Sequence, residues 1–202
     1  MKFTFFASFI VFIVWLSYEI SKHNRIDAAP FDEFWAKEHA ANRTKKQPLD
    51  NLEYITIPFD ALPMHILPDD EQVSEYRETL EFLSGSPIVN FTGISNTDLK
   101  LKYGAPNFEL LSRYDQNYTV LARTLNKWAA YLYKKGYTKE AREILEFAVS
   151  TKTDVSSSYK LLCQIYKEEN TPEKIKELYP IAEATNSAMT KTIVRILQES
   201  EL

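Results

Sequence analysis

The residue types that hold metals or form disulfides are sparse in this chain. Three histidines stand far apart, in no metal-ligand spacing: His23, His39 and His65. Glu38-His39 lacks the second histidine that a zinc-binding helix carries. A single cysteine, Cys163, excludes an intramolecular disulfide and a cysteine-based zinc site. We therefore expect no metal and no redox pair.

Motifs for nucleophilic catalysis and phosphate binding are also missing. Four glycines stand alone, so no glycine-rich loop cradles a phosphate: Gly85, Gly93, Gly104 and Gly136. No serine lies in a Gly-x-Ser-x-Gly elbow. Two pairs of adjacent carboxylates, Asp69-Asp70 and Glu168-Glu169, lie at expected helix ends. The sequence predicts neither enzymatic activity nor a cofactor, and an enzyme with an unrecognised site is the least favoured reading.

The composition is that of a folded protein. Of 202 residues, 45% are hydrophobic and 26% are charged, which excludes a wholly disordered chain. The formal net charge is −4. Because binding to phosphates requires a basic face, we expect no nucleic-acid partner.

An apolar run opens the chain. Residues 3–18 carry no charge, and as a helix they extend about 24 Å, against a hydrocarbon core of about 30 Å. The flanking lysines and a tyrosine are of the types that extend such a span. We therefore predict a transmembrane helix over residues 1–21, with membrane lipid as the partner of residues 3–20.

Two other readings of the apolar run remain open. A cleaved signal peptide requires a small-x-small site soon after the run, and Ser17-Tyr-Glu breaks that pattern. A buried core helix requires a larger globule around a segment that is apolar on every side.

Basic residues predict the sidedness of this span. Lys2 alone precedes it, whereas Lys22, Arg25 and Lys37 follow it. The positive-inside rule then places the folded part in the cytoplasm, in a single-pass protein of the cell membrane.

Residues 22–50 form a predicted juxtamembrane linker that contains a short helix from Pro30 to Asn42. Phe31, Phe34 and Trp35 share one face of that helix through their i, i+3 and i+4 spacing. One reading lays this face on lipid headgroups, with the basic residues that follow on anionic lipid. The other reading is a stalk that packs on the folded domain or is partly ordered.

Residues 51–116 combine extended and helical segments. The composition of 52–58 is typical of a strand, but three prolines confine this stretch to an edge or an irregular run. Acidic residues in the first turn and an apolar stripe predict a helix over 69–83. A helical turn over 98–103 is closed by Gly104, after its C-cap.

The strongest organisational pattern is a period of thirty-four residues, which aligns residues 122–155 with residues 156–189. The aligned pairs are Trp128 with Leu162, Ala129 with Cys163, Leu132 with Tyr166, Ala141 with Ile175, Leu145 with Tyr179, and Ala148 with Ala182. Each copy reads as two amphipathic helices and a turn, and this arrangement resembles the tetratricopeptide repeat. The turn from Lys135 to Ala141 is the most similar stretch.

The second copy departs from the family pattern. Ile175 stands where the family has a small residue, which lets the two helices pack closely. Thr153 and Ser187 stand where the family ends each repeat with proline. The resemblance is therefore strong in the first copy and moderate in the second.

The repeats need neighbours, because each one buries its apolar face only against the next. A third helix over 190–199 reads as a cap on the last repeat. The helix at 70–83 and the segment 106–116 are candidates for the N-terminal neighbour, and residues 52–68 are a candidate for an extended segment along the array. The predicted fold is mainly α, in four parts: a transmembrane anchor (1–21), a linker (22–50), an irregular and helical middle (51–116), and repeat-like helical hairpins with a cap (117–202).

The resemblance implies a concave groove, lined by the first helix of each repeat, that accepts a peptide. The residues it would present are Arg123, Asn126, Ala130, Tyr133, Lys134, Lys160, Gln164 and Lys167. This set is basic and favours an acidic peptide, although a solvated helix face is the alternative. Ala130 stands where chaperone-binding members have asparagine, so we expect no chaperone partner. The acidic stretch over residues 50–81 is a candidate to fold back into the groove.

These observations predict a membrane-anchored adaptor that binds another protein and has no enzymatic activity. The alternative is an extracytoplasmic assembly or structural factor of the cell envelope with the same fold.

Overall fold

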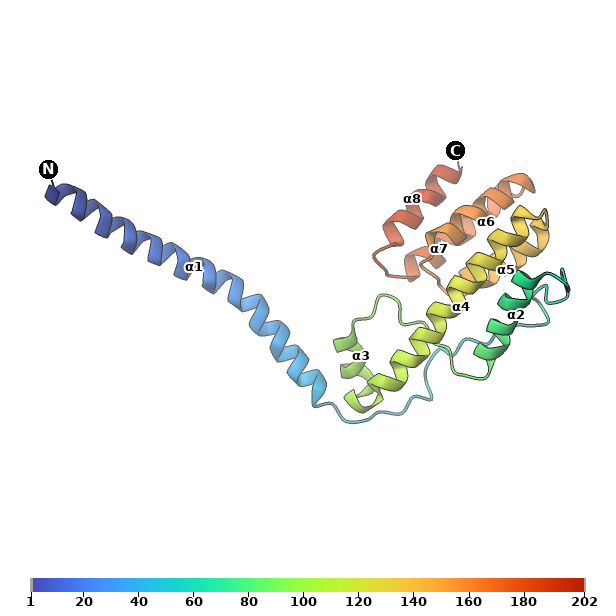
Figure 1. Cartoon of the computed structure of the whole chain (residues 1–202), viewed down its shortest axis with the longest axis horizontal. Coiled ribbons are helices and arrows are strands. Elements are labelled where there is room, and N and C mark those ends of the chain that lie inside the picture. Colours follow the sequence, from blue (N-terminus) through green and yellow to red (C-terminus); the bar gives the residue numbers. More distant parts are fainter. Residues whose placement is uncertain (1, 202) are drawn as a thin grey trace. The chain divides into compact units, whose positions relative to one another are not determined.

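The computed structural model describes the backbone of residues 2–201 and the side chains of residues 9–19 and 31–201. This part of the chain is mainly helical, as predicted (Figure 1). It contains no strand, and Tyr54 and Val89 form an isolated antiparallel bridge.

The helices form two compact units, each built from two pieces of chain. Unit 1 comprises Met1–Gln47 and Asn96–Pro106, and unit 2 comprises Pro48–Ser95 and Asn107–Leu202. The helices α3 and α4 are separated by the short turn η1 (Ala105–Asn107).

Unit 1 pairs α1 (Lys2–Asn42) with α3 (Asn96–Tyr103). The C-terminal end of α1 packs on α3, where the Glu38 carboxylate forms an ion pair with Lys100 and accepts a hydrogen bond from Thr97 Oγ1 at 2.6 Å. These two donors, Lys100 first, lower the pKa of Glu38. The predicted helix over 30–42 exists as the end of α1, which is continuous with the residues before Pro30.

Gly104 ends α3, as predicted. Its φ is +91°, a conformation that side chains disfavour. A Cβ at this position would overlap the backbone of Lys45, so the segment after α1 lies directly against Gly104.

The predicted transmembrane helix is wrong. Among the residues that the structure describes, none of the helices combines the length and the apolarity that crossing a membrane requires. The uncharged run of residues 3–18 is about 24 Å long as a helix, shorter than a hydrocarbon core of about 30 Å, and Glu19 follows it at once. The side chains at 3–8 and 20, which belong to the predicted lipid contact, lie outside the described residues, as do Lys2 and Lys22.

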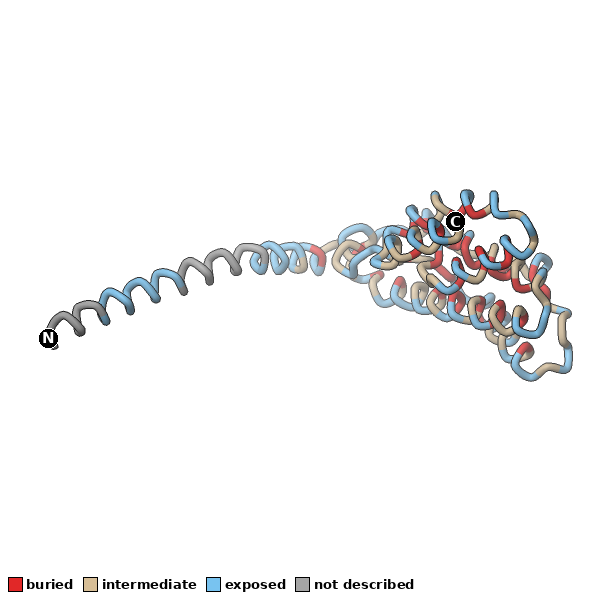
Figure 2. The backbone as a smooth tube through the Cα atoms, turned by 90° about the horizontal axis from the view of Figure 1, so that it is seen from above, coloured by how far each residue is buried: buried red, intermediate tan, exposed pale blue. Residues whose placement is uncertain are grey.

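Unit 2 consists of a row of helices: α2 (Glu71–Ser84), α4 (Phe108–Lys134), α5 (Thr138–Ser150), α6 (Ser156–Glu168), α7 (Ile175–Ala184) and α8 (Thr190–Glu201). The turn η2 (Pro172–Lys174) precedes α7. Close packing joins α2 to α4, α4 to α5, α5 to α6, and α8 to both α6 and α7. Figure 2 shows the buried residues of unit 2 gathered where these helices face one another.

The helix predicted over 69–83 is confirmed as α2. Asp70 caps it by accepting hydrogen bonds from the backbone N–H groups of Gln72 and Val73. Its start lies at the end of α4, where Asp70 accepts a hydrogen bond from Tyr131 Oη at 2.8 Å. The residues after its end lie near the start of α4, where Asn117 donates to Pro87 O at 2.9 Å. The two helices therefore run antiparallel.

The segment 106–116 forms no separate helix, because it continues into the first helix of the repeat as the 27-residue α4. The N-terminal neighbour of the repeat pair is therefore α2, together with the irregular residues before it. Leu52, Ile57 and Leu62 of that stretch are buried, and the latter two belong to the core.

The two helical hairpins, α4 with α5 and α6 with α7, pack differently. Ala141 and Ala148 are buried, and their small side chains suit the contact between α4 and α5, which is the most extensive between any two helices in the described part of the chain. In the second hairpin the buried Ile175 occupies the position of Ala141. There α6 and α7 have little direct contact, and α8 packs against both.

Candidate functional site

The eight residues predicted to line the groove lie on two neighbouring helices of unit 2. α4 carries Arg123, Asn126, Ala130, Tyr133 and Lys134, and α6 carries Lys160, Gln164 and Lys167. On each helix the spacings of three, four and seven residues place them on one face. Contacts between α4 and α6 bring parts of the two faces together.

One end of this surface is held by Asn126. Its Nδ2 donates to Ser158 Oγ at 2.9 Å, and its Oδ1 accepts from Ser157 Oγ at 3.2 Å. These bonds join the middle of α4 to the first turn of α6. Neither serine was predicted as a site residue.

The other end is a hydrogen-bonded cluster around Tyr133. Tyr133 Oη donates to Glu168 Oε1 at 2.5 Å and accepts from Gln164 Nε2 at 2.7 Å. Gln164 Nε2 also lies 3.1 Å from Glu168 Oε1. Because Asn126 pairs with Ser158 and Tyr133 with Gln164, α4 and α6 run parallel along this surface.

Glu168 is the site residue that sequence reasoning missed. The hydrogen bond from Tyr133, and then that from Gln164, lower the pKa of Glu168. The same carboxylate raises the pKa of Tyr133. A carboxylate therefore stands at one end of a surface that was expected to be basic, and its position four residues after Gln164, on the same helix face, was the signal for it.

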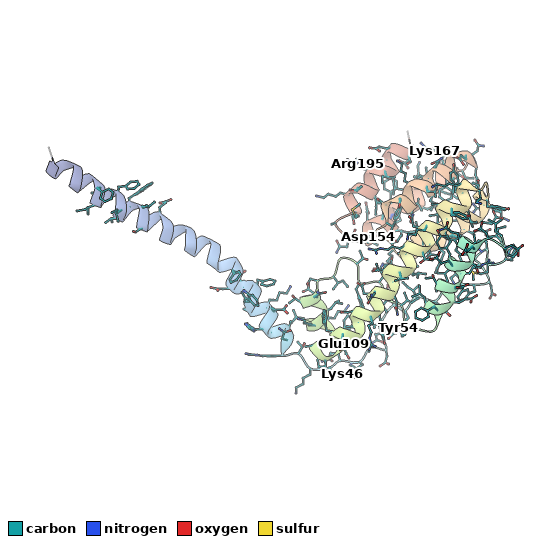
Figure 3. All side chains as sticks on the ribbon, viewed as in Figure 1. Lys46, Tyr54, Glu109, Asp154, Lys167 and Arg195 are labelled. Atoms are coloured by element: carbon teal, nitrogen blue, oxygen red, sulfur yellow. The ribbon has the colours of Figure 1, made fainter. Side chains whose placement is uncertain are left out.

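Asn126, Tyr133, Gln164 and Glu168 form a polar strip along α4 and α6. The four predicted cations lie beside this strip and take no part in these hydrogen bonds. Arg123, Lys134, Lys160 and Lys167 are exposed, and none forms an ion pair with a residue that the structure describes. Figure 3 shows Lys167 near the end of α6. The structure therefore brings Asn126, Tyr133 and Gln164 into contact with partners and leaves the four cations in solvent.

The acidic stretch contacts a different face of α4. Asp70 accepts the hydrogen bond from Tyr131 and lies 3.7 Å from Lys135 Nζ. The Tyr131 bond is the largest of the effects that lower the pKa of Asp70. Since helical residues two apart point to nearly opposite sides, Tyr131 faces away from Tyr133. Asp70 is therefore held outside the predicted groove.

The helix α8 extends the row begun by α4 and α6. It lies one further period along the chain, so that Gln198 follows Ala130 and Gln164 at intervals of thirty-four residues. Ile193 and Leu197 bury its inner side, and Gln198 is exposed. The predicted cap thus packs beside α6 and lies one period after it in the sequence.

Several other polar side chains of unit 2 link neighbouring helices. Arg142 of α5 contacts Glu169 at 3.0 Å and Glu146 at 3.2 Å, while Tyr166 Oη donates to Glu146 at 3.0 Å. The thiol of Cys163 is buried, and burial raises its pKa. Among the described residues no group of three metal-ligating side chains converges; His23 lies outside the described side chains.

Comparisons with known proteins add no relative to this picture. No family model matches the chain, and no curated protein and no solved structure matches it.

Proposed function

We propose that unit 2 is a tetratricopeptide-like protein-interaction module without enzymatic activity, which binds an acidic peptide across α4 and α6. The first support is the period of thirty-four residues, whose aligned positions are filled by buried side chains except at Tyr179, which is half-buried. Trp128 and Leu162 are fully buried at one such position, and Ala129 and Cys163 at the next. A repeat that buries matching positions presents matching outer faces.

The observation that carries the proposal is the set of four exposed cations beside the polar strip. Arg123 and Lys160 lie toward the Asn126 end, and Lys134 and Lys167 lie toward the Tyr133 end. Cations without an internal partner gain most from a carboxylate that arrives on a ligand, since charge-assisted hydrogen bonds are stronger than neutral ones.

Glu168 gives the proposed ligand an orientation. Its carboxylate repels an acidic group placed beside Tyr133. Acidic side chains of the peptide therefore concentrate near Arg123 and Lys160, and the hydroxyl of Tyr133 and the amide of Gln164 face its less charged part.

Binding of a fluorescein-labelled peptide of alternating Glu and Ser to the full chain tests this function. We expect Lys160→Glu with Lys167→Glu to weaken binding by about 10-fold or more, because two attractions become repulsions. The matched control is Lys139→Glu with Lys176→Glu, which makes the same change of charge at exposed residues of α5 and α7. Equal weakening by both pairs would mean that only net charge matters, and the proposed surface would be rejected.

A further inference from the structure

The apolar surface of α1 has no role in the proposed groove. Nine large hydrophobic side chains from Phe9 to Tyr18 are between 40% and 68% exposed. Successive helical residues are about 100° apart, so these side chains face every side of the helix. Proteins in water rarely leave so large a contiguous apolar surface uncovered.

A second apolar feature lies further along the same helix. Phe31, Phe34 and Trp35, the aromatic cluster, are 62%, 55% and 44% exposed. The ring centroids of Phe31 and Phe34 lie 5.9 Å and 5.6 Å from that of Trp35, in edge-to-face geometry. The rings thus contact one another and remain largely in solvent. Tryptophan, with its apolar body and polar N–H, is enriched at the headgroup level of membranes.

Unpaired cations follow the aromatic cluster. Arg43, Lys45 and Lys46, the basic turn, are exposed just after α1 ends, and none forms an ion pair with a described residue. By contrast, Lys37 pairs with Asp98 at 2.7 Å. Figure 3 shows Lys46 extending from the chain beyond the end of α1.

Two of the nearby acids, Asp32 and Glu33, point away from the centre of the aromatic cluster. At about 100° per residue, Glu33 points roughly opposite to the centre of the aromatic cluster, and Asp32 points to its flank. The carboxylate of Glu38, which does lie on the aromatic face, is paired with Lys100, and the first described cations after the cluster that lack an ion pair are those of the basic turn.

These features together match one kind of partner. Exposed aromatic rings followed by uncompensated cations are the combination that binds an anionic lipid surface. We propose that α1 docks on the surface of an anionic bilayer, with the aromatic cluster at the headgroups and the basic turn on lipid phosphates. This proposal does not rest on the peptide groove of unit 2.

Flotation of the full chain with vesicles tests the charge part of the proposal. We expect binding to vesicles that contain phosphatidylglycerol, and binding about 100-fold weaker for Arg43→Gln with Lys45→Gln and Lys46→Gln, because each cation near such a surface contributes on the order of 5-fold. The control replaces Lys134, Lys160 and Lys167 of unit 2 by glutamine and is expected to bind as the parent does. Equal binding by the basic-turn variant and the parent would overturn the proposal.

A fluorescent reporter tests which part of the chain contacts the lipid. In a Cys163→Ala background, which keeps a small side chain as at Ala129, a polarity-sensitive dye is attached through Phe34→Cys or, as control, Phe82→Cys. Phe82 is 79% exposed in unit 2. We expect vesicles to shift the emission to the blue at position 34 alone.

Two outcomes of the reporter experiment contradict the proposal. Flotation of the chain without a shift at position 34 would mean that the aromatic cluster stays in water. A shift without vesicles that grows with protein concentration would mean that a second copy of the chain covers the cluster.

Discussion

Gly93 joins two turns of unit 2 that lie far apart in the sequence. Its φ is +83°, and a Cβ at this position would lie 2.5 Å from the carbonyl oxygen of Asn186. The residues after Phe91 are thus seated directly against the turn between α7 and α8. Gly136, in the turn between α4 and α5, has a similar φ of +87°, but no atom lies within 4 Å of a Cβ there.

This pair of glycines separates backbone strain from steric contact. We expect Gly136→Ala to lower the free energy of unfolding by about 1–2 kcal/mol, the cost of a left-handed residue. Gly93→Ala adds an overlap with backbone, so the total loss is about 2–5 kcal/mol. Urea unfolding of both variants measures the difference. Equal losses would show that the Asn186 turn moves away freely.

Tyr159 gives the stability of unit 2 a dependence on alkaline pH. The side chain is fully buried, and its Oη donates to Thr153 O at 3.1 Å. Burial is the main effect that raises its pKa to about 12, whereas the unfolded chain has the ordinary pKa near 10. The folded state therefore holds this proton more tightly, and its contribution to stability is complete below pH 10.

We expect the free energy of unfolding to fall between pH 10 and about pH 12, as the unfolded state loses the proton first. Tyr159→Phe removes this titration and makes the slope shallower, while Tyr118 and Tyr166, whose pKa values burial also raises, maintain part of it. The lost hydrogen bond costs about 1 kcal/mol at neutral pH. Denaturant midpoints across this range measure the slope. A slope unchanged in Tyr159→Phe would assign the alkaline loss to other groups.

Single residues show how far the candidate site was predictable. A surface that combines Asn126 and Tyr133 with Gln164 of another helix was expected from the resemblance to the tetratricopeptide repeat, and in the structure hydrogen bonds join Asn126 to Ser158 and Tyr133 to Gln164. The role of Glu168 on α6 depends on the position of the hydroxyl of Tyr133, which belongs to α4. The spacing of four residues from Gln164 places Glu168 on the same helix face, but that spacing does not reveal the hydrogen bond with Tyr133, and the surface was therefore expected to be more basic than it is.

Among the helices, those of unit 2 were predictable because each carries an apolar stripe at helical spacing. Val73, Leu80 and Leu83 of α2 are buried as that pattern indicates. The extent of α4 was not predictable, because this helix runs without a break from Phe108 to Lys134. The association of α3 with α1 depends on Glu38 and Lys100, which are 62 residues apart, and on a hydroxyl of Thr44. Hydrophobic periodicity does not reveal such pairings between residues far apart in the sequence.

Because the two hairpins pack differently, we expect a larger side chain to destabilise the first hairpin and a smaller side chain to destabilise the second. Ala141 lies between the closely packed α4 and α5, so we expect Ala141→Ile to cost about 1–3 kcal/mol through overpacking. At the matching position Ile175 fills space between elements that stand further apart, so Ile175→Ala leaves a cavity and costs about 2–5 kcal/mol.

Thermal and urea unfolding measure both variants. The exposed position Lys176 serves as the control, because Lys176→Ala is expected to change stability by less than about 0.5 kcal/mol. Improved stability in Ile175→Ala would show that α6 and α7 close up as the repeat pattern prescribes, and the description of the second hairpin would then be wrong.

For the whole molecule, the division into two units follows contacts rather than chain order. The sequence favoured contiguous parts, whereas residues 96–106 belong with α1 and the chain on either side of them belongs to unit 2. Hydrophobic periodicity identifies helices but does not say which helices meet. The packing of α2 against α4 was predictable because the repeat needed an apolar neighbour, and unit 1 offered no comparable requirement.

The interleaving of the two units has a consequence for anyone who cuts or shortens this protein. No single cleavage point yields both units intact, because a chain that begins at residue 48 lacks α1 while it keeps α3, and one that begins at residue 107 loses α2 from the core of unit 2. A nick among residues 60–69 would still leave α1 tethered non-covalently, through Glu38 and Lys100, to the C-terminal fragment. The sizes of proteolytic fragments will therefore not correspond to the boundaries of the two units.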